Sequence, residues 1–242
     1  MPGMPAVILA NEDVSKDFLI ESYYDFYFWG QPVSISTTQV TTVIVVGFLI
    51  ILALIARRVI LGGNPEHPGV MQNITEMLIE SLDNMVCSGM GKHAEKYRNY
   101  ILTVVMFVFV SNISGLFGLR PPTADFAATL GLGIIVFFII QYVNLKSNGF
   151  GAVTGLFRPV PILFPINLIG EIANPISLSL RLFGNVVAGT IMLGLYYGLL
   201  PWFAKIGIPA ALHAYLDLFS GLIQTYVFVM LTMVWITDKY SD

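Results

Sequence analysis

Long apolar stretches alternate with short polar breaks along this 242-residue chain. Three of them, 37–60, 100–119 and 126–145, have about the 20 residues that a helix needs to cross a ~30 Å hydrocarbon core. Two more, 160–200 and 208–238, are longer, so they must tilt or bend in the membrane. The pattern predicts an all-α integral membrane protein with five transmembrane helices, the last two forming a long, tilted hairpin.

The segment 69–90 has a different pattern, in which apolar residues recur every three or four positions with charges between them. Its apolar stripe consists of Val70, Ile74, Met77, Leu78, Leu82 and Met85. This 3.6-residue period is that of an amphipathic helix. The charged residues Glu76, Glu80 and Asp83 make it too polar to cross a bilayer. We therefore expect this helix to lie in the membrane interface or against another helix.

Composition supports one membrane domain over 37–242, after an acidic segment at 1–36. Hydrophobic residues make up 56% of the chain and charged residues 11%, whereas soluble domains carry about 25% charged residues. The acidic segment has no basic stretch followed by an apolar core, so it does not resemble a signal peptide. The single cysteine, Cys87, excludes an internal disulfide framework. No basic run indicates nucleic-acid binding.

The basic residues between the predicted spans indicate an orientation. An outside N-terminus places eight of them inside: Arg57, Arg58, Lys92, Lys96, Arg98, Lys146, Arg158 and Lys239. Three are then outside: Lys16, Arg120 and Lys205. Because cytoplasmic loops are enriched in Lys and Arg, we expect the N-terminus outside and the C-terminus in the cytoplasm.

Arg181 is the only basic residue in the stretch 160–200. A guanidinium at the centre of a spanning helix costs about 2.5–3.5 kcal/mol, and those that persist face a polar path or an anionic partner. The alternative is that Arg181 reaches the lipid head groups with its long side chain. At about 1.5 Å per residue, however, it lies roughly 30 Å from either flank. The position therefore indicates a functional site.

Polar residues around Arg181 are spaced by three and four, which places them on one helical face. They are Glu171, Asn174, Ser177 and Asn185. The last predicted helix has a similar series, namely His213, Asp217, Ser220, Gly221 and Gln224. Two polar faces in lipid are expected to meet, giving a polar path from each side with a positive charge between them. Asn174, Ser177 and Gln224 can equally be interhelical hydrogen-bonding residues, and His213 a surface histidine.

These residues resemble a known family. The sequence PISLSLRLFGNVVAG at 175–189 resembles the SLxLRLFGNxxAG signature of subunit a of F-type ATP synthases. IQTYVFVMLTMVW at 223–235 is similar to that family's IQAFIFxMLTxVY ending, PTAD at 122–125 to its PTAD element, and Asn112 fits its NxxGL pattern. The resemblance extends from about residue 69 to the C-terminus.

The resemblance implies a stator ion channel that passes protons or Na⁺ through two offset half-channels to a rotating c-ring. Arg181 is then the stator arginine that faces the ring carboxylates, Asn185 and Gln224 are its neighbours, and Glu171 lies on the inner path. The partners implied are the c-ring, subunit b of the peripheral stalk and the bilayer. Neither a cofactor nor a resident metal is implied, only transient Na⁺, and the chain itself performs no bond chemistry. The implied location is a bacterial plasma membrane, with an organellar membrane as the alternative.

The chain departs from the family at the outer path, where bacterial relatives often carry Glu after the AG pair. This chain has Thr190 there, and Asp217 where some relatives have histidine. We interpret this as a shift of the outer acid to the last helix beside His213, with Asp125 as another acidic residue near that path. The rival function is a stand-alone secondary transporter or channel. Transporters usually show internal repeats, and none is evident here.

Overall fold

The computed structural model describes residues 22–28, 31–62, 69–149, 151, 155, 162, 164–199 and 208–240. Within them, five helical segments are long and apolar enough to cross a membrane: Thr37–Gly62, Val70–Phe117, Phe126–Asn148, Phe164–Gly198 and Ala211–Asp238. The prediction of five transmembrane helices is confirmed. The start of the acidic segment, the first residues of the predicted 160–200 span, and Lys16, Arg158 and Lys205 lie outside the described residues.

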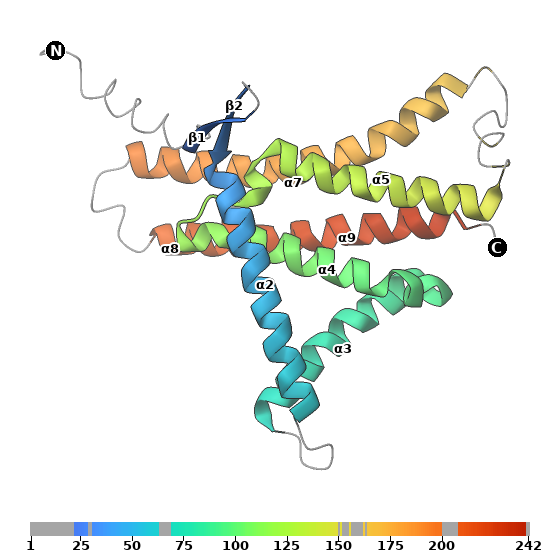
Figure 1. The fold of residues 1–242 in the computed structure, drawn as a ribbon, viewed down its shortest axis with the longest axis horizontal. Coiled ribbons are helices and arrows are strands. Elements are labelled where there is room, and N and C mark those ends of the chain that lie inside the picture. The colour runs from blue at the N-terminus through green and yellow to red at the C-terminus, as the bar shows by residue number, and fades with distance from the viewer. Residues whose placement is uncertain are drawn as a thin grey trace, which may run out of the picture.

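The helices are named as in Figure 1. They are α2 (Thr37–Gly62), α3 (Val70–Met90), α4 (Ala94–Ile113), α5 (Phe126–Asn148), α7 (Phe164–Leu199), α8 (Ile208–His213) and α9 (Ser220–Asp238). Short 3₁₀ turns lie at Gly91–His93, Ser114–Phe117 and Pro122–Ala124. A π-helical turn, Ala214–Phe219, joins α8 to α9. The predicted last span is therefore a helix with a local change of winding.

Two short strands precede the first helix, although hydropathy assigned no regular structure to 1–36. Strands β1 (Ser22–Phe28) and β2 (Gln31–Ser36) pair antiparallel. Helix α2 follows β2 directly. The Ser36 hydroxyl accepts from the Gln39 backbone N–H, and the Gln39 side chain accepts from the Ser36 N–H, both at 3.3 Å. This reciprocal pair satisfies two otherwise free donors at the start of α2.

Helices α4, α5, α7 and α9 run roughly lengthwise in Figure 1, whereas α2 crosses them steeply. Helix α7 contacts α5 and α9, and α4 contacts α9. The start of α7 is linked to the end of α9 through Glu171 and Lys239, so the two helices are antiparallel. With 36 residues, α7 is about 54 Å long, well beyond a ~30 Å core. This agrees with the predicted long, tilted hairpin.

The core lies between α4, α5, α7 and α9 and includes the last turns of α3. Its fully buried apolar residues include Met90, Ile101, Val108, Leu178, Leu182, Phe228 and Met233. Leu82 and Met85 of α3 pack against this core, whereas Val70 and Met77 near its start are 75% and 67% exposed. Helix α3 therefore lies against other helices along its second half, and its first apolar turns face outward.

Helices α5 and α7 approach closely at Gly133. A Cβ atom built there would lie 2.2 Å from the Ser179 hydroxyl oxygen and 2.8 Å from the Pro175 carbonyl oxygen. The Ser179 hydroxyl is fully buried and donates to that carbonyl at 2.8 Å. Only glycine fits at this contact, which fixes α5 against the part of α7 that precedes Arg181.

Tyr240, just after α9, fastens the end of that helix to α4. Its ring stacks on His93 with centroids 3.8 Å apart, and its hydroxyl lies 3.0 Å from that of Tyr97. The Lys96 ammonium donates to the same hydroxyl at 3.2 Å. Burial acts to raise the pKa of Tyr240, but the hydrogen bonds of Tyr97 and Lys96 and the positive charges of Lys96 and Lys146 hold it below its ordinary value.

Candidate functional site

Helix α7 exposes four of the five residues of the predicted polar face, whereas Glu171 is half-buried and pairs with Lys239. Asn174, Ser177, Arg181 and Asn185 are all exposed, whereas Leu178 and Leu182 between them are 1% and 0% exposed. The three-and-four spacing thus separates a buried apolar side of α7 from an outward polar side. In the described part of the chain, Arg181 has no hydrogen bond or ion pair. Its guanidinium is free to meet a group from outside this chain.

The polar series of α7 and α9 meet at one point only. The Asn185 side-chain amide donates to the Ser220 hydroxyl at 2.9 Å. Gln224 is instead only 6% exposed, and its Nε2 has no hydrogen-bond partner among the described residues. Gly221 faces α4, where a Cβ atom would lie 3.1 Å from Cβ of Asn112. The predicted single polar face on the last helix is therefore divided between α7 and α4.

The predicted site residue Asp217 lies in the π-helical turn, a local winding that the sequence pattern did not indicate. Such turns are rare and are often found at functional sites. Asp217 pairs with His213 one turn earlier, with 2.5 Å between Oδ2 and Nδ1. The other ring nitrogen of His213 lies 3.1 Å from the Tyr197 hydroxyl of α7. A chain of three polar groups thus connects α7, α8 and the π turn.

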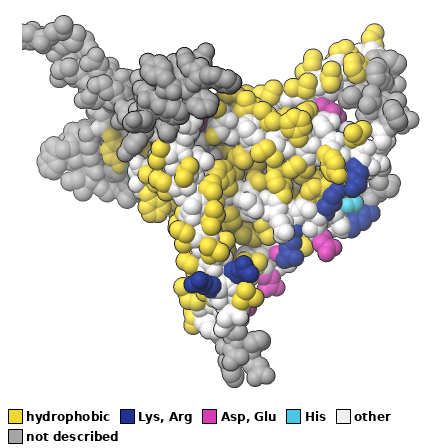
Figure 2. Space-filling view, in the orientation of Figure 1, with side chains coloured by type: hydrophobic (Ala, Val, Ile, Leu, Met, Phe, Trp, Pro, Cys, Tyr) yellow, Lys and Arg dark blue, Asp and Glu magenta, His cyan; other side chains and the backbone are white. Residues whose placement is uncertain are grey.

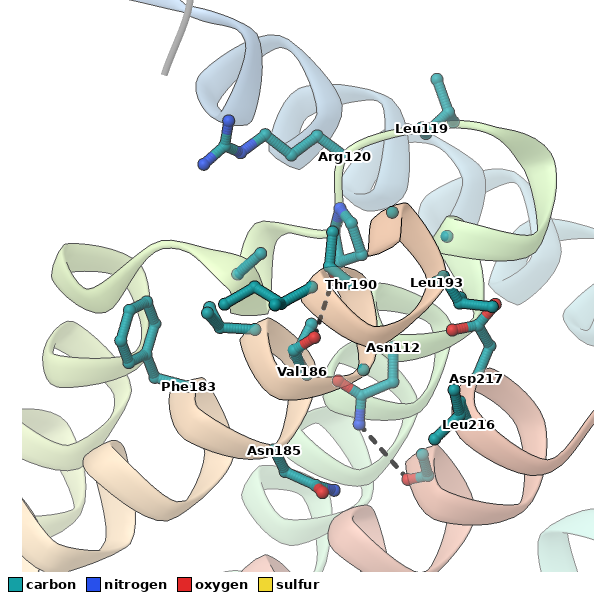
Figure 3. Close-up of a pocket in the computed structure, with 18 of the residues that line it drawn as sticks. Asn112, Leu119, Arg120, Phe183, Asn185, Val186, Thr190, Leu193, Leu216 and Asp217 are labelled. Carbon is teal, nitrogen blue, oxygen red and sulfur yellow. Dashed lines mark hydrogen bonds between the residues drawn. The ribbon is translucent and has the colours of Figure 1, made fainter. Parts of the chain in front are cut away.

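A cavity of about 1000 Å³ lies beside these three polar groups, at the α8 end of the hairpin (Figure 3). Its polar lining includes Asn112, Arg120, Asp125, Asn185, Thr190, His213 and Asp217. We call it the α8-end cavity. Thr190 donates its hydroxyl to the Val186 carbonyl at 3.0 Å, so this side chain is tied to its own helix. Asp125 caps α5, since one of its carboxylate oxygens accepts from the Ala127 N–H at 2.9 Å.

A hydrogen-bonded network around Asn112 forms part of the lining of the α8-end cavity. Its amide donates to the Gly221 carbonyl and to the Thr225 hydroxyl, both at 3.3 Å. Its carbonyl accepts from the Thr123 hydroxyl at 2.8 Å. Asn112 is 4% exposed, so this network is a buried link between α4, α9 and the turn before α5. The two family-like elements, Asn112 and residues 122–125, are thus joined to each other in this network beside the cavity.

A second polar cavity, of about 610 Å³, lies at the opposite end of the hairpin. Its polar lining consists of Asn144, Asn148, Asn167, Glu171, Asn174, Asp238 and Lys239. We call it the Lys239-end cavity. A smaller space of about 70 Å³, lined by Gln141, Pro175 and Trp235, adjoins Glu171 and Asn174. Glu171 accepts from the Lys239 ammonium at 2.8 Å and from the Gln141 amide at 2.9 Å.

The two cavities are separated along α7 by the turns that carry Arg181. The Lys239-end cavity and its small neighbour extend along α7 as far as Asn174 and Pro175, and the α8-end cavity begins at Phe183. None of residues 176–182 lines any of these three spaces. From Pro175 to Phe183 the helical rise is about 12 Å. A single exposed guanidinium thus stands between two polar spaces that are offset along one helix.

Gln141 and Lys239 were missed as partners of Glu171 by sequence reasoning. Gln141 is a polar residue inside the apolar stretch 126–145, which is the one signal that could have singled it out. Lys239 was counted only for membrane orientation. Within the described residues, no group of three or more His, Cys, Asp and Glu side chains is placed to hold a metal ion.

Comparisons with known proteins agree with the family-like motifs. Residues 38–237 match the family model described as ATP synthase A chain. The chain is 37% identical over 250 residues to the sodium-ion-specific ATP synthase subunit a of Propionigenium modestum, covering 93% of this chain and 83% of that protein. It is 34% identical over 238 residues to ATP synthase subunit a of Bacillus pumilus, covering 89% and 96%. A subunit a of Pelobacter propionicus is 35% identical, covering 83% and 86%.

Proposed function

Because the chain belongs to the ATP synthase A chain family, we propose that it is the stator half of a rotary ion path, with Arg181 facing the carboxylates of a c-ring. The observation that supports this most directly is the pair of polar cavities at opposite ends of the α7–α9 hairpin. The α8-end cavity is the outer half-channel and the Lys239-end cavity the inner one. Arg181 lies between them on the exposed side of α7.

Simple electrostatics explains how this arrangement would couple ion flow to rotation. A ring carboxylate that crosses bare lipid must be neutral, whereas beside a guanidinium it is stabilised in its charged form. An arginine does not lose its proton in proteins, so Arg181 stays charged throughout. Each carboxylate therefore releases its ion before passing Arg181 and gains another afterwards. An ion that crosses 100 mV releases about 2.3 kcal/mol, which rotation can carry to ATP synthesis.

The distribution of charge supports an inner location for the Lys239 end. Lys96 lies over the Tyr142 and Tyr240 rings at 5.8 Å, and Lys146 lies 5.9 Å from the Tyr142 ring. Figure 2 shows Lys and Arg side chains near this end of the molecule, while hydrophobic side chains cover much of the remaining face. Because basic residues concentrate on the cytoplasmic side, we place the C-terminus inside and the N-terminus outside a bacterial plasma membrane.

The partners follow from the exposed surfaces. The polar face of α7 is where the ring would contact this chain. Helix α2 exposes apolar side chains such as Val43 at 71% and Ile51 at 59%, and α3 exposes Ile74 at 53%. We assign these two helices to contact with lipid and with subunit b of the peripheral stalk. The transported ion is H⁺ or Na⁺, and the sodium specificity named for the Propionigenium protein belongs to that relative.

A stand-alone transporter is the rival function, and reconstitution separates the two. The purified chain in lipid vesicles is expected to give no ion flux above that of protein-free vesicles, because its α7 face and Arg181 lack the ring that carries the ion between the cavities. Addition of the c-ring should be required for flux, measured with a pH-sensitive dye or ²²Na⁺. Saturable flux by the chain alone would contradict the stator function.

The inner path predicts accessibility from one side only. In a Cys87→Ser background, Asn174→Cys should react with a water-soluble maleimide added from the inside, because Asn174 is exposed and lines the Lys239-end cavity. Ser179→Cys is the matched control on the same helix, since Ser179 is fully buried against α5 and should not react. Labelling is read by a mass shift. Protection of Asn174→Cys from the inside in the assembled complex would show that no aqueous path enters there.

A further inference from the structure

An ion pair in the Lys239-end cavity joins the first turns of α7 to the residue that follows α9. The Lys239 ammonium lies 2.8 Å from one carboxylate oxygen of Glu171, and the Gln141 amide donates to the other at 2.9 Å. The Glu171 and Lys239 side chains are only 19% and 26% exposed. Both oxygens of the carboxylate are thus engaged by groups from α5 and from the end of α9.

The backbone at Lys239 and at the next residue is fixed by contacts with other parts of the fold. Its backbone carbonyl accepts from the Asn148 amide of α5 at 3.2 Å. The next residue, Tyr240, is fixed by stacking on His93 and by hydrogen bonds to α4. Exposed ion pairs are weak partly because two mobile side chains must be ordered to form them. Here the backbone next to the ammonium is already ordered, so the ammonium remains within reach of Glu171.

The surroundings of the pair suit a hydrated cation. The cavity has a volume of about 610 Å³, and its lining contains four asparagines, namely Asn144, Asn148, Asn167 and Asn174. Amide and carboxylate oxygens are favourable ligands for hard cations. Glu171 is the carboxylate of this cavity on α7, and Lys239 occupies the place at its oxygen that a mobile cation would take.

We propose that Lys239 is a positioning residue that acts as a tethered counter-ion, competing with mobile cations for Glu171. The inference rests on the proposed function, in which this cavity is the inner end of the ion path. A tethered group competes at a high effective concentration, in the millimolar range for short flexible links. An ion that arrives at Glu171 is therefore displaced by the ammonium, and it leaves the cavity or passes to the ring. Gln141 keeps the carboxylate oriented while its ionic partner exchanges.

Removal of the ammonium should strengthen ion binding at the inner mouth. The assembled ATP synthase carrying Lys239→Gln is compared with the parent in inverted membrane vesicles, with ATP-driven uptake measured while inner-side Na⁺ or pH is titrated. We expect the half-saturating ion concentration to fall by about three- to tenfold, which is somewhat more than the loss of an exposed ion pair would change a binding constant. The maximal rate should fall as well. Lys239→Arg should keep both values close to those of the parent.

Three comparisons separate this function from a merely structural one. Lys146→Gln removes a positive charge from the same end of the molecule but from a side chain that lies by Tyr142, and it should leave the half-saturating concentration unchanged. In Glu171→Gln, the further change Lys239→Gln should have no added effect on that concentration. Lys239→Cys in the Cys87→Ser background should regain the parent value after aminoethylation of the thiol, which restores an ammonium.

The outcomes distinguish the counter-ion from the path itself. If Glu171→Gln slows flux but Lys239→Gln behaves like Lys146→Gln, the counter-ion inference is wrong and the inner path stands. If Glu171→Gln has no effect on flux, the inner path through Glu171 is wrong as well. Failure of the Gln and Cys variants at Lys239 to co-purify with the ring would show a structural function and overturn the inference.

Discussion

Replacing Arg181 with alanine is expected to abolish coupled transport while leaving the complex assembled. Both ATP-driven pumping and ion-driven ATP synthesis should fall by about a hundredfold or more. The reason is that a nearby positive charge at the protein surface raises the ratio of ionised to neutral ring carboxylate by powers of ten. Assembly should survive because Arg181 is exposed and contributes no hydrogen bond or ion pair to the described part of the fold. The rates are measured in inverted vesicles, and assembly by co-purification of the ring.

Arg181→Lys is the matched variant, since it keeps a positive charge and removes the planar fork. It should also lose most coupled activity, because an ammonium is a compact, titratable charge that presents different donors to a carboxylate. The ring-free chain gives the complementary control: its folding in detergent should be the same for parent, Ala and Lys variants. Normal ATP synthesis in Arg181→Ala membranes would contradict the proposed position of Arg181 between the half-channels.

The helices and the polar face of α7 could be predicted from sequence because both depend on local periodicity. Apolar stretches of sufficient length must form helices in lipid, where every backbone group needs an internal partner. The three-and-four spacing of Asn174, Ser177, Arg181 and Asn185 fixes their common side on any regular α-helix. The structure shows these four exposed and the intervening Leu178 and Leu182 buried. No tertiary information was needed for this result.

The polar series of the last helix could not be placed in the same way, because its winding changes. The π turn at Ala214–Phe219 breaks the regular period between Asp217 and Gln224. His213 and Asp217 are therefore rotated relative to the residues of α9 that a regular helix would place on the same face. Within α9 itself, the neighbours Ser220 and Gly221 are about 100° apart, so Ser220 meets α7 while Gly221 meets α4. Sequence patterns contain no strong signal for such a turn. A similar limit applies to Lys239, whose partner Glu171 is 68 residues away.

Asp217→Asn is expected to reduce ion flux severely, by about tenfold or more. Asp217 pairs with His213 at 2.5 Å in the α8-end cavity, so the change removes the carboxylate of that pair while keeping its size. A positioned acid or base typically contributes 10²–10⁴-fold to a proton transfer, which makes about tenfold a conservative expectation. His213→Ala should give a milder loss, because it removes the imidazole beside Asp217 and leaves the carboxylate itself in the cavity. ATP-driven uptake across a range of pH measures both.

Asp125→Asn is the matched control at another carboxylate that lines the same cavity. Asparagine caps helices about as well as aspartate, so this change removes a charge and keeps the start of α5. It should reduce flux much less than Asp217→Asn if the outer ion passes through the Asp217–His213 pair. Full activity in Asp217→Asn together with a large loss in Asp125→Asn would show that the ion enters past Asp125 instead.

Introducing a carboxylate at position 190 is the strongest test of where the outer ion binds. Thr190 lines the same cavity as Asp217, and among the described residues its hydroxyl bonds only to the Val186 carbonyl of its own helix. A longer acidic side chain at this position can therefore reach the cavity without breaking an interhelical hydrogen bond in the described part of the chain. Thr190→Glu combined with Asp217→Asn or with Asp217→His should therefore recover part of the flux that Asp217→Asn alone loses. Recovery means that the cavity needs one carboxylate and accepts it from either wall. Absence of recovery in a complex that still assembles would mean that the π turn itself, which aims Asp217 at His213, is what the outer path requires.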